Sequence, residues 1–344
     1  MSHSLNNHLK KLEKSSIKGF EVKKYIVFNL KYTTMLKKIS AFAFAIATSA
    51  QLLIAQQISP TIDQVKMLTS QWEGERFADG RPKVPDALLK RLEKVSMEEA
   101  WGFLRNKGYH NQFENDWIII NDDRVMTGRA LTAQYMPLRP DMNELVREIG
   151  KNEGRVQAGG TNSWPIDVLQ EGDIYVADSY AKIIDGTLIG DNLGNAIYAK
   201  SKRGVVFYGS VRDMAGLSEI DGFNGWIKGH DPSYIQQMML TTINYPIRIG
   251  RATVMPGDAV LANKYGVIFI PSFLLADLVI NAEFIMLRDE FGIQRLREGK
   301  YTAGEIDSRW SEPIVKDFLD WVNKKQDLPM SREELDNFLK DRNW

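Results

Sequence analysis

The sequence contains no cysteine, and this absence excludes several classes of protein at once. Disulfide bonds, thiolate metal sites, a cysteine nucleophile and a lipid-modified N-terminal cysteine are all impossible. Histidine is also scarce, because only His110 and His230 lie beyond residue 55. A metal site built from several histidines is therefore excluded there, and a bound metal should have oxygen ligands, as Mg²⁺, Mn²⁺ and Ca²⁺ do.

Most familiar catalytic motifs are missing as well. The chain has no HExxH, no Walker loop, no glycine-rich dinucleotide turn, no EF-hand loop and no GxSxG. His110 and His230 each lie in a polar segment, KGYHNQF and KGHDPS. We interpret both as surface or loop histidines rather than as members of a catalytic triad.

The N-terminal region has the pattern of an export signal. Residues 35–55, MLKKISAFAFAIATSAQLLIA, place two lysines before an apolar stretch with small residues, as secretory signal peptides do. The stretch is short and rich in Ala, Ser and Thr, which disfavours the alternatives, a membrane anchor or a buried helix. Residues 1–34 then read as translation from a start codon placed too early. We expect a periplasmic or secreted protein with no membrane span after cleavage near Gln51 or Gln56.

Without this leader the chain is mildly acidic. Residues 1–55 hold nine of the 44 basic residues and two of the 44 acidic residues, so the remainder has a net charge of −7. Non-specific nucleic-acid binding needs a positive field. We therefore expect no nucleic-acid partner.

Capping and turn signals divide the rest of the chain into three parts. Residues 56–95 read as an N-terminal arm that is irregular up to residue 85 and ends in a helix. Residues 96–285 form the predicted catalytic domain, which opens with a capping box at Ser96 and Glu99. Residues 286–344 read as a C-terminal helical extension. A second capping box there joins Ser331 and Glu334, and Trp310, Phe318 and Trp321 fit one amphipathic face.

The catalytic domain shows the periodicity of an α/β fold. GDIYVAD (172–178) reads as a strand, residues 192–202 as a helix, and GVVFYGSV (204–211) as a second strand. This order predicts a parallel βαβ unit. GDAVLAN (257–263) repeats the entry of the first strand, which suggests two similar strand starts in one compact sheet or barrel.

The start of the predicted helix is a candidate anion site. Asp191 precedes the helix, and the amides of Asn192 and Leu193 have no partner within it. Such amides, at the positive end of the helix dipole, bind a carboxylate or a phosphate. The alternative is that Asp191 only caps the helix.

The end of the second strand brings charged groups to the same place. Arg212 and Asp213 follow strand 204–211, and parallel sheets bind ligands at the carboxyl ends of their strands. An arginine can grip a carboxylate, one aspartate can hold a hydrated metal, and Asp191 can position a water or carry a proton. The alternative is a surface ion pair without a function.

These residues resemble the RraA-like family, which includes the 4-hydroxy-4-methyl-2-oxoglutarate / 4-carboxy-4-hydroxy-2-oxoadipate aldolases. Asp191, twenty intervening residues and then Arg212-Asp213 match the Asp-x20-Arg-Asp pattern of that family. The surrounding words GRALTA, GDIYVAD, GDNL, GVVFYGSVRD and PGDAV fit as well. The resemblance covers roughly residues 95–300.

The resemblance implies an α/β/α swivelling-type domain in a homotrimer or hexamer, with the site between subunits. It implies Mg²⁺ or Mn²⁺ as the cofactor and a small 2-oxo acid, or a sugar-acid-like compound, as the substrate. By position, Asp213 would hold the metal, Arg212 would bind the pyruvyl oxygen, and Asp191 would position a water or relay a proton. The GDNL turn, with Gly190 and the amides of Asn192 and Leu193, would take the substrate carboxylate.

The expected function is therefore a class II, metal-dependent lyase of the pyruvate-aldolase type. It would cleave or decarboxylate a 2-oxo acid through a pyruvate enolate, the charge of which the metal draws off. The alternative is a non-catalytic binding or regulatory protein, because some family members bind and inhibit a ribonuclease complex. Substitution of Asp213 distinguishes the two.

Overall fold

The computed structural model describes residues 57–121 and 124–340. The predicted early-start segment, residues 1–34, and the predicted signal peptide, residues 35–55, lie outside the described residues. No helix of the described part combines the length and the apolar character that crossing a membrane requires.

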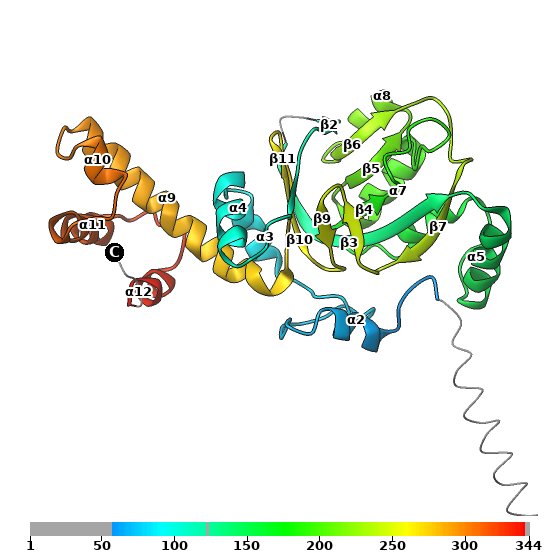
Figure 1. The fold of residues 1–344 in the computed structure, drawn as a ribbon, viewed down its shortest axis with the longest axis horizontal. Coiled ribbons are helices and arrows are strands. Elements are labelled where there is room, and N and C mark those ends of the chain that lie inside the picture. The colour runs from blue at the N-terminus through cyan, green and yellow to red at the C-terminus, as the bar shows by residue number, and fades with distance from the viewer. Residues whose placement is uncertain (1–56, 122–123, 341–344) are drawn as a thin grey trace, which may run out of the picture. The chain divides into compact units, whose positions relative to one another are not determined.

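The core of the protein is a mixed sheet with a parallel centre (Figure 1). Its strands follow the order β1-β11-β10-β3-β4-β5-β6-β2, and β7 pairs with the C-terminal part of β3. The pairs β3–β4, β4–β5 and β5–β6 are parallel, and the outer pairs are antiparallel. The bounds of these strands are β1 Phe113–Glu114, β2 Ile118–Ile119, β3 Met126–Pro137, β4 Asp173–Asp178, β5 Val205–Val211, β6 Gly225–His230, β7 Met238–Ile243, β10 Ala259–Asn263 and β11 Gly266–Ile270.

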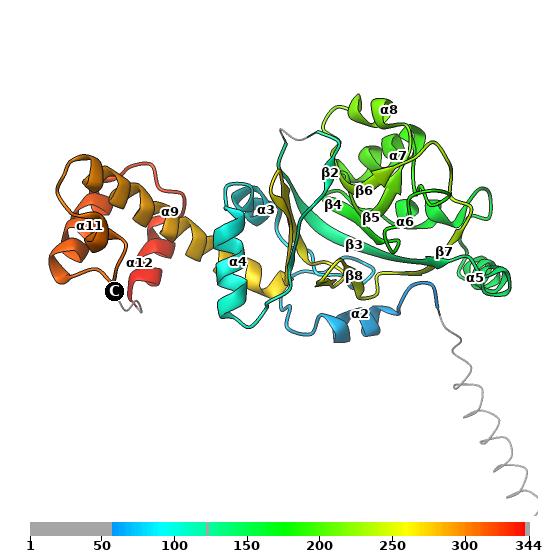
Figure 2. The same ribbon diagram turned by 45° about the horizontal axis from the view of Figure 1, so that its top comes forward.

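The two faces of the sheet are covered differently. One face packs on a helical layer through a core that includes Val146, Trp164, Ile197 and Leu217 (Figure 2). The other face packs on the small antiparallel sheet of β8 and β9. The covering elements are α5 Pro140–Asn152, α6 Trp164–Asp167, α7 Asp191–Ser201, α8 Met214–Ser218, β8 Ile247–Ile249 and β9 Ala252–Val254, with short 3₁₀ turns at Thr161–Ser163 and Ser272–Leu274.

This architecture confirms the predicted α/β class and the predicted βαβ unit. The helix α7 joins the parallel strands β4 and β5, as the sequence pattern indicated. The two Gly-Asp pairs also have the same structural role, because each aspartate stabilises a turn of the same kind before its strand. Asp173 Oδ2 accepts the Gln170 N–H at 2.8 Å, and Asp258 Oδ2 accepts the Met255 N–H at 2.8 Å.

The N-terminal arm is more ordered than its composition suggested. Residues 62–68 form helix α2 (Ile62–Leu68), which a capping box between Thr61 and Gln64 starts, so the prediction of irregular structure up to residue 85 is wrong there. The arm then inserts Arg81, which has no exposed surface, and its Nη2 donates to Asp173 Oδ2 at 2.9 Å. An ion pair between segments 92 residues apart cannot be read from local sequence pattern.

The next two helices follow the prediction. The helix α3 (Asp86–Leu92) ends the arm, and α4 (Met97–Asn106) begins at the predicted capping box. Ser96 Oγ accepts the Glu99 N–H, and Glu99 Oε2 accepts the Ser96 N–H. Both helices pack against β10 and β11 together with α9.

The C-terminal extension is helical, as predicted. Helix α9 (Leu275–Arg297) contacts α3 and α4 at one end and α10–α12 at the other (Figures 1 and 2). Its second half packs into an aromatic core with Phe318 and Trp310, and the Ser331–Glu334 capping box is present. The domain boundary drawn at residue 285 falls inside this one helix. The remaining helices are α10 Ala303–Ile306, α11 Glu312–Lys324 and α12 Arg332–Lys340.

Candidate active site

Backbone hydrogen bonds bring the start of α7 to the end of β5. The chain before the helix runs beside the strand, with a parallel bridge between Thr187 and Ser210. The Leu188 N–H donates to Ser210 O, and the Arg212 N–H donates to Ile189 O, both at 2.9 Å. This pairing places Gly190 next to the side chains of Arg212 and Asp213.

Gly190 is the point of closest approach. It is the N-cap of α7, and a Cβ built on it would lie 2.2 Å from Asp213 Oδ2 and 3.0 Å from Arg212 Nε. Real Cβ atoms do not come this close to other atoms, so a side chain at this position would displace the aspartate. The φ of Gly190 is −118°, which any residue can adopt, so only the contacts with Asp213 and Arg212 would oppose a side chain here.

Arg212 and Asp213 form an ion pair that remains open to solvent. Arg212 Nε lies 3.4 Å from Asp213 Oδ2, and the two side chains are 43% and 45% exposed. Asp213 has a φ of 57°, in the left-handed region that costs a non-glycine residue about 1 kcal/mol. Such strain is common where a side chain must be held for a ligand. The pair is therefore accessible to a ligand.

Asp191 is the first residue of α7 and lies beside α8. Its Oδ1 accepts the Asn192 N–H at 2.7 Å, and its Oδ2 lies 2.9 Å from the position of a Cβ on Gly216. The Asn192 amide, which we expected to be free, thus already has a partner in this structure. A substrate carboxylate at the helix start would have to displace the Asp191 carboxylate or use the next amide, that of Leu193.

The oxygen donors fit a weakly held divalent ion better than a closed metal cage. The described residues contain no group of three or more acidic or histidine side chains able to hold a metal. Mg²⁺ commonly binds one or two carboxylates and completes its shell with water and substrate oxygens. A half-exposed carboxylate such as Asp213 suits that mode of binding.

The loops after β4 and β6 flank the same edge. The Asp231 N–H donates to Val211 O at 3.1 Å, and Ser233 joins the loops because its N–H donates to Asp231 Oδ1 and its Oγ accepts the Asp185 N–H. His230 pairs in register with Val211, so it lies one strand away from Arg212. His230, which the sequence indicated as a surface or loop residue, is exposed at the end of β6.

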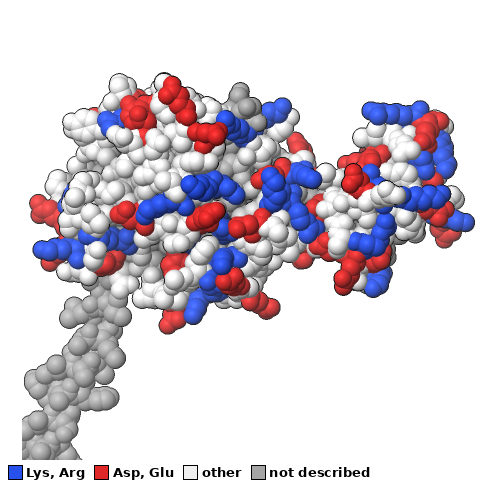
Figure 3. Space-filling view, turned by 180° about the vertical axis from the view of Figure 1, so that it is seen from behind, with Lys and Arg blue, Asp and Glu red and all other residues white. Residues whose placement is uncertain are grey.

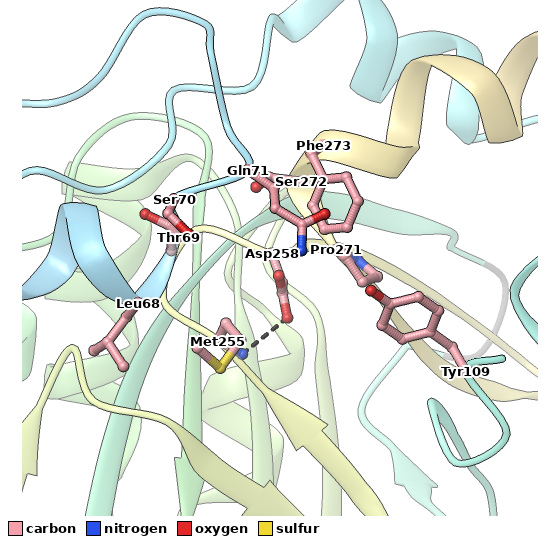
Figure 4. Close-up of a pocket in the computed structure, with 10 residues that line it drawn as sticks. All are labelled: Leu68, Thr69, Ser70, Gln71, Tyr109, Met255, Asp258, Pro271, Ser272 and Phe273. Carbon is pink, nitrogen blue, oxygen red and sulfur yellow. Dashed lines mark hydrogen bonds between the residues drawn. The ribbon is translucent and has the colours of Figure 1, made fainter. Parts of the chain in front are cut away.

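The opposite edge of the sheet has a cavity of about 190 Å³ beneath the N-terminal arm (Figure 4). It contains Asp258, which is buried, and burial raises the pKa of this carboxyl to about 7 despite hydrogen bonds from the Met255 and Ser272 amides. Asp258 closes the turn described above, so its position has a structural explanation. A larger cavity of about 1070 Å³ lies in the C-terminal extension, between α9 and the segment before α12.

The arrangement defines a class: an α/β protein with an arginine, a carboxylate and a helix start at the carboxyl edge of a parallel sheet. Comparison with known proteins gives the family. The description RraA-like, Aldolase/RraA, matches residues 82–269, and the chain belongs to this family.

The individual relatives are distant. A protein of Ectopseudomonas mendocina (strain ymp), named as a candidate 4-hydroxy-4-methyl-2-oxoglutarate aldolase, is 27% identical over 109 residues. The match covers 32% of this chain and 66% of that protein, slightly less than two thirds of its length.

Two solved structures share the fold. One is Streptomyces coelicolor RraAS2, described as an unusual member of the RNase ES inhibitor RraA protein family, with 24% identity and a TM-score of 0.53. The other is an uncharacterized protein from Pseudomonas syringae pv. tomato str. DC3000, with 18% identity and a TM-score of 0.52. The similarities cover 62% and 66% of this chain and all of each of those chains.

Proposed function

We propose that this protein is a divalent-metal-dependent lyase that cleaves or decarboxylates a 2-oxo acid through a pyruvate enolate. The observation that carries the proposal is the contact of Gly190 with Arg212 and Asp213. A glycine N-cap that lies against an accessible arginine–aspartate pair, with the aspartate in a left-handed backbone conformation, is better explained by a ligand site than by a surface ion pair. The family membership and the named aldolase relative support the same reaction class.

Each residue has a role that follows from its position. Arg212 binds the 2-oxo group or the carboxylate of the pyruvyl part, for which its planar donors are suited. Asp213 is the ligand for Mg²⁺ or Mn²⁺, and the metal, when bound, stabilises the negative charge on the enolate oxygen. The amide of Leu193, at the start of α7, would help bind the substrate carboxylate.

Asp191 is the proposed proton carrier. Its carboxylate lies at the start of α7, where Oδ1 accepts the Asn192 N–H. An ionised carboxylate can take a proton from the substrate hydroxyl, directly or through one water. The hydrogen bond between the Asp191 carboxylate and the Asn192 amide is exposed and joins neighbouring residues. Rotation of the Asp191 side chain would break it and let the carboxylate contact substrate or water instead.

The exposure of the ion pair suits a site that a second subunit completes. We therefore propose a homotrimer or hexamer, with a periplasmic or secreted location that follows from the predicted signal peptide. Analytical ultracentrifugation tests the assembly, and N-terminal sequencing of the native protein tests the location. A monomer, or a chain that retains Met1 in a cytosolic fraction, would contradict these two expectations.

The reaction is tested by pyruvate release from a panel of 2-oxo acids with Mg²⁺, with Mn²⁺ and with a chelator. We expect metal-dependent release that Asp213→Ala abolishes and Arg212→Lys strongly reduces. Arg139→Lys is a matched control, because Arg139 forms an exposed pair with Asp141 at the start of α5. If no compound releases pyruvate with either metal, the alternative of a non-catalytic binding protein gains support.

A further inference from the structure

The cavity beneath the N-terminal arm contains a buried carboxylate. Asp258 is 3% exposed and is one of the residues that line this space of about 190 Å³. Figure 4 shows it between Ser70 and Gln71 of the arm on one side and Tyr109 on the other. Of the described residues that line the cavity, none is basic and Asp258 alone is acidic. The cavity therefore has a negative group with no cation among its walls.

The matching turn before β4 shows how the protein neutralises such a carboxylate elsewhere. Asp173 and Asp258 each accept an amide N–H at 2.8 Å and stabilise turns of the same kind. Arg81 Nη2 lies 2.9 Å from Asp173 Oδ2, and Arg129 Nε lies 4.0 Å from Asp173 Oδ1. Asp258 has no ion pair with any described residue and lies at a cavity instead. A turn needs only a hydrogen-bond acceptor, so it does not explain a buried negative charge without a partner.

The arginine beside this cavity is held by neutral oxygens of the arm. Arg76 Nη1 donates to Thr69 Oγ1 at 2.7 Å, and three further hydrogen bonds join its guanidinium to backbone carbonyls of the arm. Arg76 does not line the cavity, although Thr69 does. Burial raises the pKa of Asp258 to about 7, as expected for a carboxyl group whose lost hydration no nearby cation offsets.

The cavity has the size of a small organic molecule. A cavity of about 150 Å³ holds benzene, so about 190 Å³ accommodates about seven or eight non-hydrogen atoms. Tyr109 and Phe273 contribute aromatic side chains to the lining, and aromatic rings attract cations. Ser70 and Gln71 are exposed, so the arm side gives access from solvent.

We propose that this cavity binds a small organic ammonium ion, with its charge against the Asp258 carboxylate and its carbon skeleton against Tyr109 and Phe273. The ligand supplies to Asp258 the charge that Arg81 supplies to Asp173. The site precedes β10, at the edge of the sheet opposite to Arg212. The inference therefore does not depend on the proposed lyase activity.

Two matched pairs of compounds test the inference. They are cyclohexylammonium with cyclohexanol and benzylammonium with benzyl alcohol, and within each pair the size is nearly the same while the ammonium member alone is charged. Isothermal titration calorimetry is carried out on the purified protein at about pH 8, where the Asp258 carboxyl is ionised. We expect at least one ammonium ion to bind at least about tenfold more tightly than its alcohol.

Two variants connect this preference to the cavity. Asp258→Asn keeps an acceptor for the turn and removes the charge, so it should lower the affinity for the ammonium ion at least about tenfold and change that for the alcohol by less than about twofold. Asp277→Asn is the matched control, because Asp277 is exposed in the first turn of α9 and does not line the cavity. This control should keep the wild-type preference.

The outcomes decide the inference in either direction. It is overturned if the wild type binds neither ammonium ion, or binds both no more tightly than their alcohols. It is also overturned if the preference persists in Asp258→Asn, because the cation then binds elsewhere, or if Asp277→Asn loses the preference to the same extent. The comparison within the wild type remains decisive even if Asp258→Asn does not fold.

Discussion

Substitution of Gly190 by alanine tests the proposed site without removing any of its functional groups. The new Cβ would lie 2.2 Å from Asp213 Oδ2, whereas an ordinary contact needs about 3.4 Å, so the carboxylate must move by about 1 Å. Alanine adopts the φ of −118° without strain, and the displaced atom is the end of a side chain. The free energy of unfolding should therefore change by less than about 1 kcal/mol.

The activity should respond much more strongly than the stability. A misplacement of about 1 Å in a catalytic group can cost about 100-fold in rate, so we expect kcat/KM for pyruvate release to fall by that order. The apparent affinity for Mn²⁺ should weaken in parallel, because Asp213 is the proposed ligand. The measurements are pyruvate release, Mn²⁺ titration and thermal unfolding on the same preparations.

The control is Gly102→Ala in α4. A Cβ at Gly102 meets nothing within 4 Å, and alanine in a helix is favoured over glycine by up to about 1 kcal/mol. This variant should unfold at an equal or higher temperature and keep full activity. If Gly190→Ala retains wild-type kcat/KM and Mn²⁺ affinity, the close approach of Asp213 has no functional meaning and the reasoning fails.

Three further predictions concern stability. Burial raises the pKa of Asp258 to about 7, so the folded protein binds this proton more tightly than the unfolded chain does. As the pH rises from about 4 to about 7, the free energy of unfolding of the wild type should therefore fall by about 4 kcal/mol relative to that of Asp258→Asn. Urea unfolding at each pH measures this difference. Arg81→Ala leaves the buried carboxylate of Asp173 without its main cation and should destabilise the fold by about 3–5 kcal/mol, and a denaturation midpoint equal to that of wild type would contradict this. Ser96→Ala removes one half of a capping box and should cost about 1 kcal/mol in chemical unfolding, with Ser70→Ala, at an exposed position outside any helix, as a comparison.

Local sequence pattern predicted most of the elements because their causes are local. The capping boxes at Ser96 and Ser331 and the strand–helix–strand order around α7 all depend on residues a few positions apart. The convergence of Gly190 with Arg212 and Asp213 was predictable for a related reason. Once β4 and β5 are parallel, the start of α7 and the end of β5 must meet at one edge.

The features that were missed depend on contacts between distant segments. The pairing of Arg81 with Asp173 and the cavity beneath the arm require the arm to cross the sheet, which no periodicity specifies. The order of β6 next to β5 decides that His230 and Asp231 lie beside the end of β5. The hydrogen bond from the Asn192 amide to Asp191 depends on the rotamer of the Asp191 side chain, which the sequence does not determine.

The surface offers a check on the expectation about nucleic acid. On the face shown in Figure 3, acidic and basic side chains are interspersed over both the sheet domain and the C-terminal helices. A stripe of one sign, as phosphate backbones require, is not visible on that face. The expectation that the protein has no nucleic-acid partner remains a prediction, which the absence of a retarded band with RNA or DNA in a gel-shift assay at low salt would support.

Helix α9 has a practical consequence for anyone who wishes to study the sheet domain alone. A chain cut after residue 285 would end just beyond Phe284, which is wholly buried against Phe318 and Phe338. It would also lose Glu334, one of the two carboxylates that hold Arg91 of the preceding α3. Expression of a shortened domain should therefore yield aggregated material, and recombinant designs should keep the chain through residue 340.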